Sequence, residues 1–266
     1  MTLAEYFEKN LYNTRLKLST VISMRSSLNF VKKYDIDLSK ISIEWLNKFD
    51  AKLKSSGLAQ SSVTKVHRHV KTMIRQADFA GLIPRNPYGQ FRMEKINTTR
   101  KFLSEDEMYA IIGRGGYYSA IFEFQCLTGM HVSDLVDFSK DKVSFVSVDG
   151  SSFPVIRGER KKNGEPYLIP LSRRAEEIAK SKNYSFHMDV IEYNKWLKDA
   201  AQEVGIGFPV TSSVARHTYA TLALGKGASL ESISEALGHT SVGTTAIYAK
   251  VTGQKIIKDY VKNGLI

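Results

Sequence analysis

Three short segments with strand-like patterns interrupt a chain whose apolar residues otherwise recur with a helical period. Alternation over residues 143–148 and 153–157, and an apolar run over 166–171, predict three strands. Asn163-Gly164, between the second and third segments, is a strong signal for a hairpin turn. Strands joined by such short connections pair antiparallel. We therefore expect a mainly α-helical (α+β) fold with one small three-stranded antiparallel sheet in its second part.

Helix signals lie on both sides of this sheet. Thr2 with Glu5, and Ser104 with Glu107, form the pattern of a capping box, in which side chains satisfy the first free amides of a helix. Further helices are expected, from their apolar periodicity, over residues 61–80, 173–181, 188–204, 213–225, 229–237 and 241–249.

The two parts of the chain differ in charge. Residues 1–100 hold 18 of the 38 Lys and Arg but only 8 of the 27 Asp and Glu. Prolines and glycines break the helical pattern between residues 84 and 89. The sequence therefore predicts a basic domain over 1–84, a linker over 85–100 and a nearly neutral domain over 101–266. A basic domain favours an anionic partner, with duplex DNA as the first candidate and an anionic membrane surface as the second.

The helix expected over residues 61–80 carries the basic residues that best suit DNA. Its valines and isoleucine form an apolar stripe, and its remaining face is cationic, with Lys65, Arg68, His69, Lys71 and Arg75. A helix with an apolar back and a cationic front can lie along DNA phosphates or in the major groove. A solvated basic face without a partner is the alternative interpretation.

Other features bear on where the protein acts. Cys126 is the single cysteine, so no disulfide can form within the chain, and its apolar surroundings predict burial. The sequence shows no signal-peptide pattern and no run of about eighteen apolar residues that would span a bilayer. We expect a cytoplasmic, nucleoid-associated protein with double-stranded DNA as its partner and no membrane contact.

Four segments of the second part share the order and spacing of a known signature. Arg216-His217-Thr218 is followed by Leu237-Gly238-His239 and then by Tyr248, and residues 128–135 read Thr-Gly-Met-His-Val-Ser-Asp-Leu. Together they resemble the tyrosine recombinase, or phage integrase, family, in which the upstream element reads Thr-Gly-x-Arg-x-Ser-Glu/Asp-Leu. The resemblance is greatest to integrases of conjugative transposons and related mobile elements. Those proteins commonly carry an arm-binding domain before the basic domain, and this sequence starts without one.

The resemblance implies a fold, an activity and an assembly. It implies that a helical core-binding domain and a catalytic domain form a clamp around DNA, which they cleave and rejoin site-specifically through a 3′-phosphotyrosine. No metal, ATP or other cofactor is implied. Family members assemble as tetramers on two DNA sites through a C-terminal segment. The tail with Ile256, Ile257 and Val261 is therefore expected to dock on a neighbouring protomer, or else to pack on its own domain, and a monomer without DNA stays an open alternative.

The implied chemistry requires cations, because the pentacoordinate phosphorus of the transition state carries extra negative charge. Arg216 can donate a bidentate contact to the nonbridging oxygens, and His239 can donate another hydrogen bond. The resemblance makes Tyr248 the nucleophile and Lys162, on the hairpin, the general acid for the departing 5′-oxygen, with Lys161 as a rival. Since an ordinary tyrosine has a pKa of about 10, Tyr248 needs a nearby base or a strong positive field.

Two positions depart from the family pattern. His131 stands where the family has its first arginine, and Ser213 stands where it has a histidine three residues before Arg216. An imidazole that is only partly charged at neutral pH replaces a permanent cation, and a hydroxyl replaces an imidazole. Each loss costs on the order of 10²–10³ in rate. A raised pKa of His131, or a contribution from Arg157 or Arg160, would compensate.

These departures leave alternatives to an active recombinase. The first is a catalytically impaired DNA-binding relative, acting as a regulator or accessory factor, and the second is a topoisomerase-like enzyme that reseals the same strand. For two neighbours of Arg216 a structural role is favoured over catalysis. His217 follows Arg216 directly and so faces another side of the helix, and Ser213 is expected to be the helix N-cap.

Overall fold

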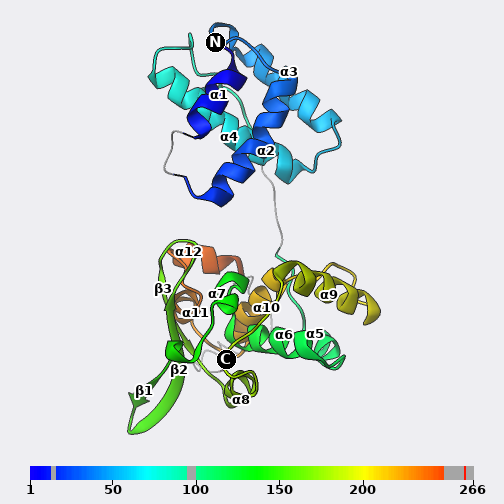
Figure 1. The fold of residues 1–266 in the computed structure, drawn as a ribbon, viewed down its shortest axis with the longest axis vertical. Coiled ribbons are helices and arrows are strands. Elements are labelled where there is room, and N and C mark those ends of the chain that lie inside the picture. The colour runs from blue at the N-terminus through cyan, green and yellow to red at the C-terminus, as the bar shows by residue number, and fades with distance from the viewer. Residues whose placement is uncertain (13–15, 95–99, 249–260, 262–266) are drawn as a thin grey trace. The chain divides into compact units, whose positions relative to one another are not determined.

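The computed structural model describes residues 1–12, 16–94, 100–248 and 261, which belong to two units, residues 1–98 and 99–266 (Figure 1). Each unit has its own hydrophobic core. Within the described residues, helices predominate and the strands form a single sheet of three. The expected mainly α-helical fold with a small antiparallel sheet is thus confirmed.

The N-terminal unit is built from helices whose starts follow the local sequence signals. They are α1 (Leu3–Leu11), α2 (Leu18–Lys33), α3 (Ile43–Ser55) and α4 (Gln60–Phe79), with short 3₁₀ turns at Leu38–Lys40 and Pro87–Gly89. The capping box before α1 is formed, because the side chains of Thr2 and Glu5 each accept the other residue's backbone N–H. The valines and isoleucine of the apolar stripe on α4 are all buried.

Part of the segment that we expected to be a linker packs into this unit. Tyr88 lies in the Pro87–Gly89 turn, is buried, and has its hydroxyl 3.0 Å from Nδ1 of His67 on α4. Phe91 packs on the same core and stacks on the His67 ring. The packed structure of the first unit therefore continues to at least residue 91, and residues 95–99 lie outside the described part of the chain.

In the second unit, helices come before and after the three strands along the chain. They are α5 (Glu105–Ile112), α6 (Tyr117–Thr128), α7 (Val132–Val136), α8 (Arg173–Ser181), α9 (Val190–Glu203), α10 (Ser212–Gly225), α11 (Leu230–Ala236) and α12 (Val242–Thr245), with 3₁₀ turns at Lys140–Lys142 and Ala246–Tyr248. The core lies between α6 and the helices around it, and Cys126 is buried there as expected.

The sheet runs in the order β1 (Val143–Val148), β2 (Ser151–Glu159) and β3 (Pro166–Pro170), and both pairs are antiparallel. Its inner end is buried against the helices through Ile156 and its partner Ile169, whereas the β1–β2 hairpin projects away from them (Figure 1). The β2–β3 connection carries Gly164 with φ +75°, a conformation that glycine adopts without strain. The sheet thus holds this turn beside the helices that carry the functional residues.

The helix expected over residues 241–249 is shorter in the structure than the sequence suggested. It is α12 followed by the 3₁₀ turn at Ala246–Tyr248, and Ala249 lies outside the described residues. Ile256 and Ile257 of the expected tail also lie outside them. Across the described ranges, no helix has the length and apolar character needed to cross a bilayer.

Candidate functional site

Arg216 lies at the centre of the candidate site and is almost fully buried on α10. Its Nη1 donates to the carbonyl of Gly129, 2.8 Å away, and its Nη2 donates to the carbonyl of Leu237 at 2.5 Å. Gly129 is the C-cap of α6 and Leu237 is the C-cap of α11, so the guanidinium faces the negative ends of two helix dipoles. Burial and the charge of Arg160 lower the pKa of Arg216 to about 9, which still leaves it charged at neutral pH.

The glycine of the Thr-Gly element is required by this arrangement. Gly129 has φ +65°, and a Cβ at this position would lie 2.3 Å from Cδ1 of Tyr219 and 2.8 Å from Cδ2 of Leu237. Any side chain would push the α6 terminus away from α10 and α11. Gly129 therefore lets its own carbonyl reach Arg216.

His239 contacts Arg216 from the loop after α11. Its Nε2 lies 3.2 Å from Arg216 Nη2, and its Nδ1 lies 2.8 Å from Oγ1 of Thr245. A guanidinium only donates hydrogen bonds, so Nε2 accepts here and the ring proton sits on Nδ1. Burial, Arg216 and Arg160 lower the pKa of His239 to about 4, so the imidazole is neutral.

Tyr248 lies beside the same helix, in the 3₁₀ turn after α12. Its hydroxyl lies 2.7 Å from Nδ1 of His217, and the two rings are 5.3 Å apart. Burial raises the pKa of Tyr248, while the charges of Arg216 and Arg100 oppose that rise. The structure thus brings together Arg216, His239 and Tyr248, which the family signature singled out from three separate segments.

His217 makes a contact with Tyr248 that the sequence interpretation did not predict. We expected it to pack structurally because it faces away from Arg216, yet its ring contacts the hydroxyl of the expected nucleophile. Burial, together with Arg100 and Arg216, lowers the pKa of His217 to about 4. The hydroxyl of Tyr248 thus contacts α10 at His217. The position of His217 next to Arg216 in the sequence does not reveal this contact.

His131 occupies the N-cap of α7. Its Nδ1 accepts a hydrogen bond from the backbone N–H of Ser133 and lies 2.8 Å from the Ser133 hydroxyl. Burial, with Arg160 and Arg216 next in effect, lowers its pKa to about 4. With this pKa His131 is neutral in the free protein at pH 7, rather than partly charged as its residue type alone suggests, because burial and two nearby guanidinium groups disfavour the charged ring.

Arg160 supplies a second guanidinium beside Arg216. It is buried at the end of β2, and its Nη1 forms an ion pair with Oδ2 of Asp134 at 3.0 Å. Gly238 fits against it, since a Cβ on this residue would lie 2.6 Å from Arg160 Cγ. Arg160 also lowers the pKa values of His131 and His239, whereas Arg157, the other compensating cation considered, is exposed.

The two candidate lysines lie on the β2–β3 turn and are both exposed. Lys161 is held by its backbone N–H, which donates to Asp134, and by its ammonium, which lies 2.8 Å from Oδ2 of Asp137. Lys162 contributes to the positive field at His131 and helps to lower the pKa of that residue.

Ser213 is not the N-cap of its helix. The helix begins at Ser212, its N-cap is Thr211, and Ser213 is exposed in the first turn. The backbone N–H of Ser212 donates instead to Oδ1 of Asn194 on α9 at 2.9 Å. A side chain from another helix thus caps this one, which a local sequence pattern does not show.

The basic face of α4 in the N-terminal unit is exposed at Lys65, Arg68, Lys71 and Arg75. His69 does not share this environment, because it is half-buried and its Nδ1 lies 2.8 Å from Oγ of Ser27 on α2. Burial, together with the charges of Lys65 and Arg68, lowers the pKa of His69 below that of a free imidazole. The four exposed cations are therefore the part of the predicted DNA-binding set that is available to a partner.

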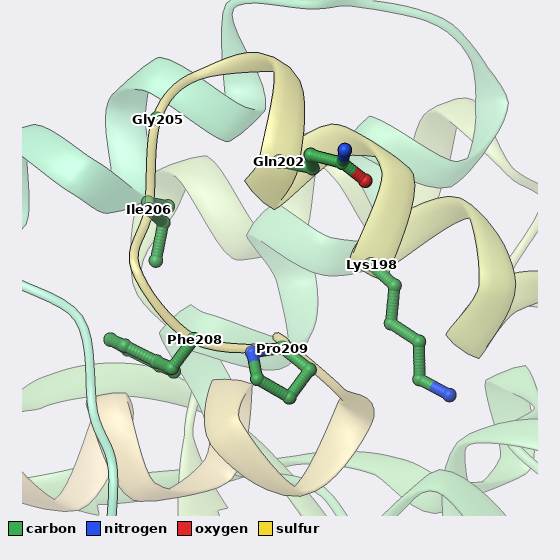
Figure 2. Close-up of a pocket in the computed structure, with 6 residues that line it drawn as sticks. All are labelled: Lys198, Gln202, Gly205, Ile206, Phe208 and Pro209. Carbon is green, nitrogen blue, oxygen red and sulfur yellow. The ribbon is translucent and has the colours of Figure 1, made fainter.

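The second unit also has a shallow pocket, between the C-terminal part of α9 and the loop that follows it. Figure 2 shows its lining by Lys198, Gln202, Gly205, Ile206, Phe208 and Pro209. None of the residues around Arg216 lines it. Within the described ranges, no group of three or more His, Cys, Asp and Glu side chains is arranged to hold a metal ion.

Two family models match the chain. The model described as "Phage integrase SAM-like domain" matches residues 2–96, and the model described as "Phage integrase family" matches residues 101–255. Among curated proteins, the tyrosine recombinase of Thermosipho africanus is 24% identical over 254 residues, which is 87% of each chain. Tyrosine recombinase XerA of Pyrococcus horikoshii is 28% identical over 270 residues, 90% of this chain and 89% of that protein.

Solved structures show the same fold at lower identity. The Tn1549 transposon integrase in complex with transposon right end DNA has a TM-score of 0.77 at 14% identity, covering 98% of this chain and 99% of that one. A lambda integrase dimer bound to a COC′ core site has a TM-score of 0.79 at 20% identity, covering 96% and 97%. A lambda integrase tetramer bound to a Holliday junction has a TM-score of 0.77 at 20% identity, covering 95% and 80%.

Proposed function

Because the chain belongs to the phage integrase family of tyrosine recombinases, we propose that it is an active site-specific recombinase that cleaves and rejoins DNA through Tyr248. The observation that carries this proposal is the convergence of Arg216, His239 and Tyr248 from separate elements onto one buried cluster. The alternative of a DNA-binding relative without cleavage has no support from the named relatives, which are called recombinases or integrases.

In the proposed reaction, Tyr248 attacks a backbone phosphorus and displaces the 5′-oxygen, leaving a 3′-phosphotyrosine. Arg216 and His239 donate to the nonbridging oxygens, and Lys162 on the turn gives a proton to the 5′-oxygen. For His239 to donate from Nε2, its ring proton must move from Nδ1 to Nε2, and the phosphate then replaces the contact that Nε2 now makes with Arg216. The phosphotyrosine conserves the bond's free energy, so rejoining requires no ATP.

The two departures from the family pattern do not leave the site without charge. We propose that Arg160 provides the second guanidinium that the family takes from the position of His131, and that Asp134 orients it. His131, neutral in the free protein, would then contribute at most a hydrogen bond to the phosphate. Ser213 is exposed and would contribute no charge.

The test of the proposed function is capture of the covalent intermediate from a pool of DNA in which every target sequence is represented. The full chain is mixed with random-sequence duplexes, denatured with detergent, and any attached DNA is recovered and sequenced. Mass spectrometry of the digested adduct is expected to find the nucleotide on Tyr248, joined through a DNA 3′ end. DNA that binds before denaturation but never remains attached would contradict the proposal.

Arg160→Gln is expected to slow adduct formation by about 10²–10³, because one cation facing the transition state is lost. Arg160→Lys keeps a positive charge beside Asp134 and is expected to lose less, about tenfold, from the poorer geometry. Initial rates on a duplex recovered from the pool measure both effects, and thermal denaturation reports whether the variants fold.

Arg157→Gln is the matched control, because it removes an exposed arginine three residues earlier, on β2. Its rate is expected to equal that of the parent. A folded Arg160→Gln protein that reacts as fast as the parent would show that the second guanidinium comes from elsewhere.

We propose that the basic face of α4 meets DNA phosphates, with the two units forming a clamp around the duplex. Lys65→Ala and Arg68→Ala are each expected to weaken binding of unrelated duplexes to a similar extent. Each should also reduce the slope of log K against log salt by about one, because one phosphate contact is lost. Fluorescence anisotropy across a salt series measures both quantities.

Lys180→Ala is the control for the change in net charge, since the Lys180 ammonium is already paired with Glu176 on α8. It should leave the salt slope unchanged. If Lys65→Ala and Arg68→Ala behave like this control, the face of α4 does not contact the duplex.

Assembly on DNA is part of the same proposal. We propose a homotetramer on two DNA sites, held by the C-terminal tail, by analogy with the lambda integrase tetramer. A recombinase acts on chromosomal DNA, so the nucleoid of the cytoplasm is its proposed location. The recognised DNA sequence would come from the duplexes recovered from the random pool.

A further inference from the structure

The contact between His217 and Tyr248 addresses a requirement that the proposed reaction leaves open. A phenol is a weak nucleophile until it loses its proton, and the family's histidine three residues before Arg216 is here Ser213. We infer that His217 accepts the proton of Tyr248 when the tyrosine attacks DNA, and so supplies the imidazole that Ser213 lacks. This inference rests on the proposed function and names a further catalytic residue for it.

The geometry of α10 makes such a replacement direct. Ser213 and His217 are four residues apart on one helix, so they lie on the same face, one turn apart. Moving an imidazole from position 213 to position 217 shifts it by about 6 Å along the helix axis without changing the side that it faces. Arg216 lies on a different side of the helix, and Tyr248 closes the site from the His217 side.

The protonation state of His217 suits an acceptor. With its pKa at about 4, the ring is neutral at pH 7, and Nδ1 can accept the hydrogen bond from the Tyr248 hydroxyl at 2.7 Å. Burial lowers this pKa most, and the positive charges of Arg100 and Arg216 lower it further. A DNA phosphate bound at Arg216 cancels part of that positive field, so substrate binding makes His217 a stronger base.

The step balances in both directions. In cleavage, the proton moves from the Tyr248 hydroxyl to Nδ1 of His217, the phenolic oxygen bonds to phosphorus, and the bond from phosphorus to the 5′-oxygen breaks. The departing oxygen takes its proton from Lys162. In rejoining, a 5′-hydroxyl gives its proton to Lys162 and attacks phosphorus, and Tyr248 leaves with the proton that His217 returns.

If His217 has a purely structural role, its replacement by asparagine should affect the rate of adduct formation differently than if it acts as a base. An asparagine at position 217 can place its amide oxygen near the present position of Nδ1, so it can accept the tyrosine's hydrogen bond but cannot take its proton. His217→Asn is therefore expected to bind DNA as the parent does and to form the covalent adduct about 10²–10³ more slowly. His187→Asn, which changes an exposed histidine away from the site, is the matched control and should react normally.

Two further measurements separate proton acceptance from support of the fold. A duplex with a sequence recovered from the random pool is synthesised with a nick and with sulfur in place of the bridging 5′-oxygen. A thiolate leaves without needing a proton. This substrate is expected to restore the rate of Lys162→Ala but not that of His217→Asn. Free imidazole is expected to accelerate His217→Ala, which has space for it, and to leave the parent unchanged.

The outcomes distinguish the two proposals. If the parent forms an adduct and His217→Asn forms it at the parent rate, His217 only positions the hydroxyl and the inference fails while the recombinase proposal stands. Rescue of His217→Asn by the sulfur substrate would likewise overturn it, since it would place the defect at the leaving group. If the parent forms no adduct, the proposed function itself fails.

Discussion

Tyr248→Phe is expected to remove all detectable covalent attachment to DNA while leaving the fold and the DNA affinity close to those of the parent. The ring of Tyr248 packs in a cluster with Ala220, Leu224, Ile233 and Leu237, and phenylalanine keeps that packing. The change removes only the nucleophilic oxygen and one hydrogen bond to His217, a stability cost of about 1 kcal/mol. Detergent gels of the protein with a labelled duplex, beside anisotropy for binding, measure both properties.

Tyr219→Phe provides the control. Tyr219 lies on α10, packs against the same cluster and is a partly buried phenol whose pKa burial also raises. It is expected to form the adduct at the parent rate. An adduct that persists in Tyr248→Phe would assign the nucleophile to another residue and would remove the basis of the proposed reaction.

Arg216→Gln is expected to lower the rate of adduct formation by at least about 10³, because the transition state loses its central cation. It should also destabilise the catalytic unit by roughly 2–4 kcal/mol, since the buried carbonyls of Gly129 and Leu237 lose their donor. Adduct rates and denaturant unfolding of the full chain measure these two effects.

Arg216→Lys separates the two effects. A lysine keeps the charge, but its compact ammonium cannot span both carbonyls and a phosphate as a guanidinium does. We expect it to remain slow while recovering part of the stability. Arg173→Gln, a change at an exposed arginine paired only with Glu177, should alter neither property. A parent-like rate in Arg216→Lys would show that the guanidinium shape is not needed.

Local signals predicted much of the fold because several of its elements are specified by nearby residues. The capping boxes at Thr2 and Ser104 begin helices where expected, and β1 has the predicted bounds Val143–Val148. The errors arise where distant residues decide. Asn194 caps α10 in place of Ser213, and the contact of Tyr88 with His67 draws part of the expected linker into the first unit.

In the site, too, some features follow from the sequence pattern and others depend on distant residues. The spacing of the signature identified Arg216, His239 and Tyr248 because their order along the chain is characteristic of the family. The contact of His217 with Tyr248 was not predicted, because it depends on how the chain returns after α12, although the four-residue spacing of His217 from Ser213 was visible in the sequence. Arg160 was one of two candidate arginines, and its burial and its contact with Asp134, which distinguish it from Arg157, depend on the folded structure.

The two roles of Arg216 bear on how such proteins diverge. Its guanidinium ties the ends of two helices together whether or not DNA is ever cut, so selection for a stable fold alone would preserve it. A descendant kept only for DNA binding would lose the Tyr248 hydroxyl and the His217 ring long before it lost this arginine. If Tyr248 and His217 act as proposed, their paired presence among related sequences is therefore a better mark of retained chemistry than this arginine.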